Sequence, residues 1–158
     1  MKAVKVKGLD PRAPLADNAA LIVATRLGEL RSFAPQALSR DEVTAQHDMR
    51  IAAKRLRYVL ETVGLCLGEA ADDGRRAARE VQTVLGDLHD CDVLIEMIER
   101  HTSGSGAPPT DRGLEALVAR TVERRDQLHA DFEALWSKLE ADDVWARLEA
   151  AAEEPNPA

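Results

Sequence analysis

The sequence predicts an all-α protein, an antiparallel four-helix bundle with a short extra C-terminal helix. Three observations lead to this prediction. Hydrophobic residues make up 45% of the 158 residues and aromatic residues only 3%, and the abundant Ala, Leu, Arg and Glu favour helices. Apolar residues recur at helical spacing in several long segments, and no segment shows the alternation of a strand. Glycine and proline are few and lie mostly at the ends of these segments.

The first helix is predicted to follow an extended N-terminal arm. Residues 1–14 combine lysine, glycine and proline, a composition that indicates the arm. A helical repeat of apolar residues then runs from Leu15 to about Phe33. Pro35 fits poorly inside a helix, so we expect the helix to end before it.

The second and third helices are predicted from their capping residues. Ser39 and Glu42 have the spacing of a capping box, so the second helix should begin at Ser39 and run to about residue 67. The third should begin near Asp72–Gly74, where an aspartate can cap the first turn, and continue to about residue 101.

A flexible linker is predicted to precede the last two helices. Residues 102–109 are rich in Ser, Gly and Pro and form this linker. Thr110 or Asp111 should cap a fourth helix that ends near residue 139. Asp142 or Asp143 should start a short fifth helix that ends before Pro155. Residues 15–154 are therefore predicted to form one helical domain.

Bulk composition limits the classes of function. The longest apolar run, residues 19–24, has only six residues, far fewer than a membrane span needs. The lysines near the N-terminus are not followed by an apolar signal region. Two cysteines are too few for a disulfide framework. We therefore expect a cytoplasmic protein that makes no contact with membranes.

The charge is unevenly distributed along the chain. The net charge of −7 argues against general binding to nucleic acid, which is therefore an unlikely partner. Residues 46–58, however, contain four basic residues and one acidic residue, whereas residues 140–154 contain six acidic residues and one basic residue. The sequence thus predicts a local cationic surface and an acidic C-terminal segment.

One side of the predicted second helix carries a cationic stripe. At 100° per residue, the core side of this helix consists of Met49, Ala52, Ala53, Leu56, Val59, Leu60 and Val63. The stripe lies on the opposite side and consists of His47, Arg50, Lys54, Arg57, Tyr58 and Glu61. Arg55 lies beside the stripe. Arginine and lysine bind phosphate groups, and the donors rise by about 4–6 Å per step, a spacing comparable to that of repeating charges. The alternative is an ordinary solvated surface.

The third and fourth helices add candidate residues to this surface. The polar side of the third helix consists of Arg75, Arg79, Gln82, Gly86, His89 and Asp90. Gly86 costs about 1 kcal/mol relative to alanine inside a helix, which suggests close approach by the second helix or by a ligand; the alternative is a glycine tolerated at a surface position. In the fourth helix, Arg125 and His129 fall within the apolar stripe. They either border the same site, or Arg125 reaches the surface and His129 is a hydrogen-bonded core residue.

Two segments resemble the signatures of a known family. His47-Asp-Met-Arg-Ile-Ala-Ala-Lys-Arg-Leu-Arg-Tyr-Val-Leu-Glu61 and Gln82-Thr-Val-Leu-Gly-Asp-Leu-His-Asp-Cys-Asp-Val93 resemble, in the right order, those of the CHAD family, the conserved histidine α-helical domain. This resemblance implies a domain that binds inorganic polyphosphate, in the cytoplasm and in association with polyphosphate granules. Transferred onto this sequence, the binding residues of the first signature are His47, Arg50, Lys54, Arg55 and Arg57.

The sequence departs from the family pattern in two ways. The second signature often has Arg-Asp where this chain has His89-Asp90, so that a fixed charge becomes titratable. Family domains usually contain two helical halves related by a pseudo-two-fold axis, and this chain is long enough for one. A homodimer that rebuilds the axis is therefore expected, although a single half-site is the alternative.

The combined prediction is a polyphosphate-binding module that has no catalytic activity, metal or cofactor. The expected binding residues are His47, Arg50, Lys54, Arg55, Arg57, Tyr58, Arg75, Arg79, Gln82, His89 and Arg125. One alternative is a metal-dependent phosphohydrolase that uses the pairs His47-Asp48 and His89-Asp90, although the neighbouring cations would repel a divalent ion. Another is a helical interaction bundle that binds an acidic partner protein.

Overall fold

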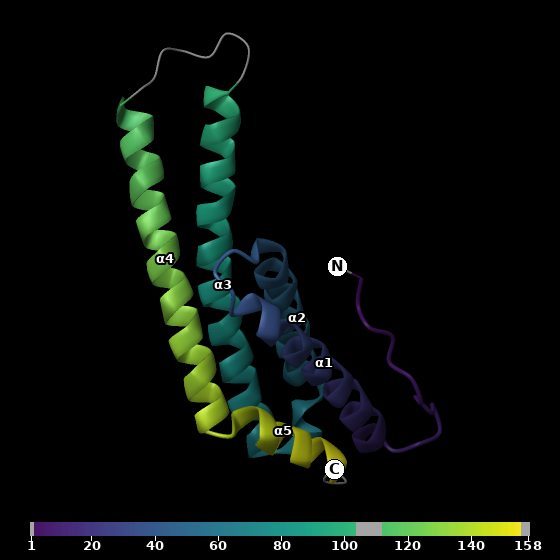
Figure 1. Cartoon of the computed structure of the whole chain (residues 1–158). Coiled ribbons are helices and arrows are strands. Elements are labelled where there is room, and N and C mark those ends of the chain that lie inside the picture. Colours follow the sequence, from purple (N-terminus) through teal and green to yellow (C-terminus); the bar gives the residue numbers. More distant parts are fainter. Residues whose placement is uncertain (1, 104–111, 156–158) are drawn as a thin grey trace.

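The computed structural model describes residues 2–103 and 112–155, which contain α-helices, one short 3₁₀-helix and no strand (Figure 1). The elements in chain order are α1 (Leu15–Ala37), α2 (Val43–Val63), the 3₁₀-helix η1 (Gly64–Leu67), α3 (Glu69–Thr102), α4 (Arg112–Ala141) and α5 (Val144–Glu153). The predicted all-α fold with a short C-terminal helix is therefore confirmed.

The helices pack as two hairpins, α1–α2 and α3–α4, together with the short helix α5. α2 lies between α1 and α3, and α4 packs on α3. α5 crosses one end of the bundle and contacts α1, α3 and α4 (Figure 1). α3 and α4 also extend well past the other end of the α1–α2 pair. No helix in the described part of the chain is long and apolar enough to cross a membrane.

The main core runs along the α1–α2 hairpin and continues to α5. Phe132 and Trp136 of α4 and Trp145 of α5 pack in series, with ring centroids 6.5 and 5.6 Å apart. Met49 and Leu56 of α2 are completely buried. Since burying one such side chain contributes about 1.5–3 kcal/mol, the apolar side of α2 fixes the direction in which its polar side points.

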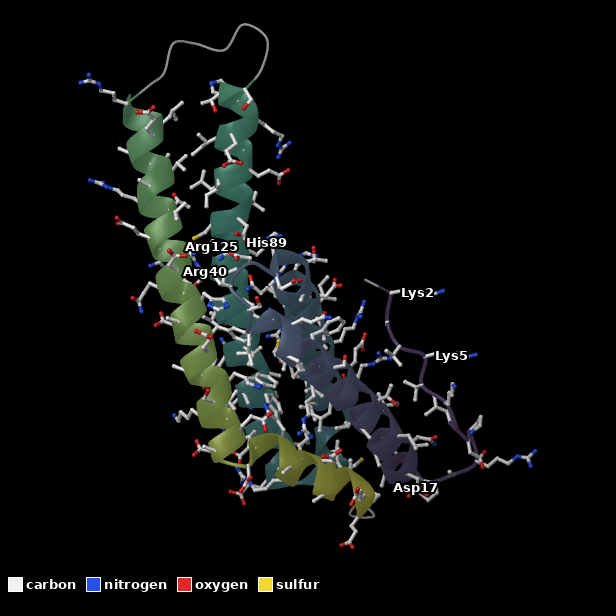
Figure 2. All side chains as sticks on the ribbon, viewed as in Figure 1. Lys2, Lys5, Asp17, Arg40, His89 and Arg125 are labelled. Atoms are coloured by element: carbon white, nitrogen blue, oxygen red, sulfur yellow. The ribbon has the colours of Figure 1, made fainter. Side chains whose placement is uncertain are left out.

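The N-terminal arm runs along α1 in the opposite direction to the helix. The Val4 N–H donates to Glu29 Oε1 over 3.3 Å, and Arg26 Nη2 donates to the Val4 carbonyl over 2.8 Å. Farther along the arm, the Asn18 side chain exchanges two hydrogen bonds with the Asp10 backbone. Figure 2 shows Lys2 and Lys5 directed away from the bundle.

Pro35 does not end α1, contrary to the prediction. The helix continues to Ala37 because Ala34 and Ala37 are both buried and packing favours the extra turn. Proline removes one N–H from the helical ladder. The turn is nevertheless closed by the Leu38 N–H, which donates to the Ala34 carbonyl over 3.1 Å.

The predicted capping box at Ser39 is wrong. α2 begins at Val43, its N-cap is Glu42, and no side chain caps it. Instead, the Glu42 N–H donates to the Ser39 carbonyl over 3.2 Å, so these residues form the turn before the helix. A residue of α2 fixes the connection between α1 and α2: Gln46 Nε2 donates to the Ser39 carbonyl over 2.9 Å.

The remaining boundaries differ from the prediction by up to one turn. The α-helical part of α2 stops at Val63, and η1 fills the interval before Gly68, which has a φ of +64°. α3 begins directly after this glycine, at Glu69, so Asp72 lies inside the helix and does not cap it. α5 follows Asp143, as predicted. Residues 104–109 of the predicted linker, together with Thr110 and Asp111, lie outside the described residues.

Candidate functional site

α2 presents its polar side between α1 and α3. The residues predicted for its core side are buried (Met49, Ala52, Ala53, Leu56 and Leu60) or partly buried (Val59 and Val63). On the other side, His47, Arg50 and Arg57 are partly buried, and Lys54 and Tyr58 are exposed. The amphipathic pattern thus places the predicted stripe on the surface, with its inner members against α3.

α3 meets this side of α2 in an antiparallel register. The rings of His47 and His89 have centroids 4.9 Å apart. One turn away, Arg50 Cδ lies 3.9 Å from the position that a Cβ would occupy on Gly86. Since the two helices run in opposite directions, Lys54 lies at the level of Gln82, and Arg57 at the level of Arg79.

Gly86 is the residue of α3 that faces Arg50. The close approach predicted at Gly86 is not found. At 3.9 Å, an added methyl group would make only ordinary van der Waals contact. An alanine would fit at Gly86, so the space there does not require glycine.

Several cations at this surface have no acidic partner. Among the described residues, Arg50, Lys54 and Arg79 make no ion pair. Arg57 approaches Glu61 at 3.7 Å and Arg75 approaches Asp72 at 3.6 Å, both on the same helix and at the long end of the range. Surface pairs of this kind contribute little energy. The positive charge is therefore available to an anion.

Tyr58 adds an aromatic surface beside the cations. The guanidinium of Arg57 lies 4.5 Å from the centre of the Tyr58 ring, and Lys54 Nζ lies 5.8 Å from it. Both distances are within the range of cation–π attraction. The ring therefore helps to hold Arg57 and Lys54 in place while leaving their N–H groups free to bind.

Unsatisfied polar atoms concentrate at the same surface. In the described chain, six side-chain N or O atoms are shielded from solvent and lack a hydrogen-bond partner, and four of them belong to this surface. These four are His47 Nδ1, Arg50 Nε, Arg57 Nε and Gln82 Oε1. Because buried polar atoms normally have partners, this concentration indicates a place where water or a ligand completes the bonding.

The two histidines stand at one end of the surface. Burial lowers the pKa of His47 from its ordinary 6.5, and the neighbouring His89 and Arg50 lower it further. A groove of about 460 Å³ opens beside the pair, lined also by Asp92, Glu96 and Glu99. The groove walls include the apolar side chains of Val43, Val93 and Ile95.

Two predicted site residues occupy a different environment. Arg55 points towards α1, where its Nη1 donates to Glu29 Oε1 over 2.8 Å. Arg125 is buried and donates to Asp92, to the Arg40 carbonyl and to Gln46 Oε1. Figure 2 shows Arg125 and Arg40 where α3 and α4 meet the end of the α1–α2 hairpin.

Arg79 and Arg75 lie towards the edges of the surface. Arg79 is exposed and also lines a groove between α3 and α4, together with Arg76 and Glu80. Arg75 lies at the level of Glu61, near the η1 end of α2. The structure thus brings His47, His89, Arg50, Lys54, Arg57 and Gln82 together, with Tyr58 beside them and Arg79 and Arg75 at the margin.

Sequence reasoning missed the carboxylates that surround this surface. Glu29 holds Arg55 from a different helix, and no local pattern predicts this pairing. Glu96 was detectable, because it follows His89 by seven residues and therefore lies on almost the same side of α3. Within the described residues, no group of three or more His, Cys, Asp or Glu side chains is arranged to hold a metal ion.

The structure defines a helical domain with a cationic surface formed by two neighbouring antiparallel helices. The model of the CHAD domain family matches residues 3–99, which cover the arm, α1, α2 and most of α3. Because this match spans more than half of the chain, the protein belongs to the CHAD family. Comparisons with curated proteins and with solved structures gave no match.

Proposed function

We propose that this protein is a binding module for inorganic polyphosphate and that it catalyses no reaction. The family to which the chain belongs is associated with polyphosphate binding. The observation that carries the proposal is the group of unpaired cations, Arg50, Lys54 and Arg79, next to unsatisfied polar atoms on α2 and α3. A polymer of phosphates supplies both the negative charge and the acceptor oxygens that this surface lacks.

The arrangement favours a phosphate chain over nucleic acid. Binding to single-stranded nucleic acid normally uses several aromatic side chains on which bases stack, and this surface offers only Tyr58. The net charge of −7 also opposes general attraction to nucleic acid. A flexible polymer without bases can follow the α2 surface using phosphate contacts alone.

A titration with long-chain polyphosphate tests the proposal directly. The purified protein is titrated at two salt concentrations with polyphosphate, with single-stranded DNA of equal charge and with orthophosphate. We expect tight binding to polyphosphate that weakens steeply with salt, because bound cations release counter-ions from the polymer. Equal affinity for DNA would reduce the surface to a general cation patch, and no binding to either polymer would contradict the proposal.

The same preparation tests the two alternative functions. Stoichiometric Mn, Fe or Zn in the purified protein, together with release of orthophosphate from polyphosphate, would favour a phosphohydrolase. Saturable binding to an acidic protein, with no binding to phosphate polymers, would favour an interaction bundle. We expect neither result.

We also propose that the protein forms a homodimer through the projecting part of α3 and α4. These parts of the two helices carry four exposed apolar side chains, namely Val93, Met97, Leu117 and Val122. Large exposed apolar surfaces commonly mark protein contacts. Light scattering should give twice the 17.3 kDa mass of the chain, and Met97→Glu should give the monomer. A monomer at all concentrations would contradict this proposal.

A further inference from the structure

The polar side of α3 changes sign along its length. Arg75, Gln82, His89 and Glu96 follow one another at intervals of seven residues and therefore lie almost in line along the helix. The side chains along this line pass from a cation, through an amide and an imidazole, to a carboxylate. Gln82 and His89 of this line face α2 and belong to the cationic surface. The surface therefore ends after His89, where the line reaches Glu96.

The histidine end of the surface is followed by carboxylates. Glu96 and Glu99 are exposed and line the same groove as His47 and His89. Asp92 also lines this groove, but Arg125 neutralises it. Glu96 forms an exposed ion pair with Arg100 of the next turn at 3.6 Å, which neutralises it far less than Arg125 neutralises the half-buried Asp92. A phosphate chain that continued past the histidines would meet negative charge.

The opposite end is also bounded by carboxylates. Glu61 lies 3.7 Å from Arg57, and Asp72 lies 3.6 Å from Arg75. Both acids are exposed and stand at the η1 end of the α2–α3 pair. The surface therefore lies between Glu61 and Asp72 at the η1 end and Glu96 and Glu99 of α3 at the histidine end.

The dimensions of the surface give the size of ligand that it accommodates. From His47 to Arg57 the α2 axis rises by roughly 15 Å, at 1.5 Å per residue. His47, Arg50, Lys54 and Arg57 form four levels along this rise. If each level binds one or two phosphates, the surface holds about four to eight phosphate units, given this helical rise.

We propose that the acidic boundaries make this a closed-ended site for a short segment of polyphosphate. This inference rests on the proposed function and specifies which length of ligand the site selects. Once a chain covers the four levels, additional units gain no contacts, and those that lie along α3 beyond His89 are repelled by Glu96 and Glu99. Longer chains bind more copies of the protein but do not bind each copy more tightly.

Polyphosphates of defined length test this inference. We measure the affinity per binding site by calorimetry for chains from about three to more than one hundred units, a range chosen to bracket the four helical levels. The affinity should rise with length up to about eight units and then remain constant. A continued increase per site would overturn the inference while the proposed function stands, whereas a failure of every length to bind would remove both.

A double variant isolates the role of the histidine-end boundary. Glu96→Gln with Glu99→Gln should raise the affinity for long chains about fivefold, the size expected from two exposed like-charge contacts. It should leave the affinity for a four-unit chain unchanged. Glu123→Gln with Glu140→Gln on α4 is the matched control, since it changes the net charge equally but away from the surface. Equal gains in both double variants, or no gain in the first, would overturn the inference.

Discussion

Arg125 and Arg50 both have shielded guanidinium nitrogens, but they differ in what surrounds them. Arg125 donates to a carboxylate, a carbonyl and an amide oxygen that come from α3, the α1–α2 connection and α2. Arg50 has no acidic partner among the described residues, and its Nε atom is shielded without a hydrogen bond. The fold satisfies the first arginine but not the second.

The neighbours Lys54 and Arg55 repeat this contrast within a single turn of α2. Arg55 points to α1 and pairs with Glu29, whose side chain is only 1% exposed. Lys54 is exposed and lies over Tyr58. A buried carboxylate therefore distinguishes a cation that the fold pairs from one that stays unpaired, and charge along the sequence does not.

Removing the satisfied arginine should have the largest effect on stability. Arg125→Met removes the donor to Asp92 and to Gln46 Oε1, and breaking a buried pair in this way costs about 3 kcal/mol or more in the free energy of unfolding. Urea denaturation followed by circular dichroism measures this loss. Arg79→Met, on the exposed side of α3, should change the same quantity by less than about 0.5 kcal/mol. Similar losses in the two variants would contradict the comparison.

Removing an unsatisfied cation should affect binding instead. Arg50→Ala and Lys54→Ala should each weaken polyphosphate binding by roughly tenfold, since each removes charge-assisted hydrogen bonds to phosphate. The slope of log affinity against log salt should fall by about one for each residue. Calorimetry at several salt concentrations gives both values.

The control for this prediction is Lys138→Ala, which removes an exposed charge from α4. Its affinity and salt slope should match those of the unmodified protein. All three variants should unfold at nearly the same urea concentration. Unchanged affinity in both Arg50→Ala and Lys54→Ala would show that polyphosphate binds elsewhere.

The sequence predicted the fold and the α2 stripe because both depend on local periodicity. Leu56 and Arg50 lie about 120° apart around the helix axis whatever the helix packs against. Helix ends were less predictable: Ser39 has the side chain of a cap, but its carbonyl accepts from Glu42 in a turn that Gln46 anchors from inside α2. Tertiary contacts of this kind override local capping preferences.

The roles of individual arginines could not be predicted for the same reason. Arg55 is followed two residues later by Arg57, and helical geometry alone places one only beside the stripe and the other within it. Glu29 decides the role of Arg55, yet it lies 26 residues away on another helix. Arg125 likewise depends on Asp92, which is 33 residues away. Such pairs follow from packing, which periodicity does not specify.

Lowering the pH should destabilise the free protein and strengthen polyphosphate binding. The pKa of His47 is lowered from 6.5 in the folded protein, mainly by burial and further by His89 and Arg50. The unfolded chain therefore binds more protons as the pH falls through this range, so the free energy of unfolding decreases with falling pH. A bound polyanion favours the imidazolium form instead. Polyphosphate binding should consequently take up protons and tighten as the pH falls.

A pH series of binding measurements tests this sign. Between about pH 7.5 and 5.5 the affinity for long chains should rise, by less than the tenfold per pH unit that one proton allows. His47→Gln should flatten the rise. His101→Gln, at the exposed far end of α3, should leave it intact. A rise that is equally steep in both variants would assign the protonation to another group.

The smallest predicted effect concerns a cation that is only partly satisfied. Arg57 lies between the two classes, because Glu61 approaches it at 3.7 Å across exposed surface while its Nε remains without a partner. Such a pair contributes about 0.2–1 kcal/mol. Glu61→Gln should therefore release Arg57 and raise polyphosphate affinity by about twofold, with stability almost unchanged. Glu123→Gln on α4 removes the same charge away from the surface and should raise affinity less. If Glu61→Gln instead weakened binding, the carboxylate would be orienting Arg57 towards the ligand, and partial pairing would be a feature of the binding site in its own right.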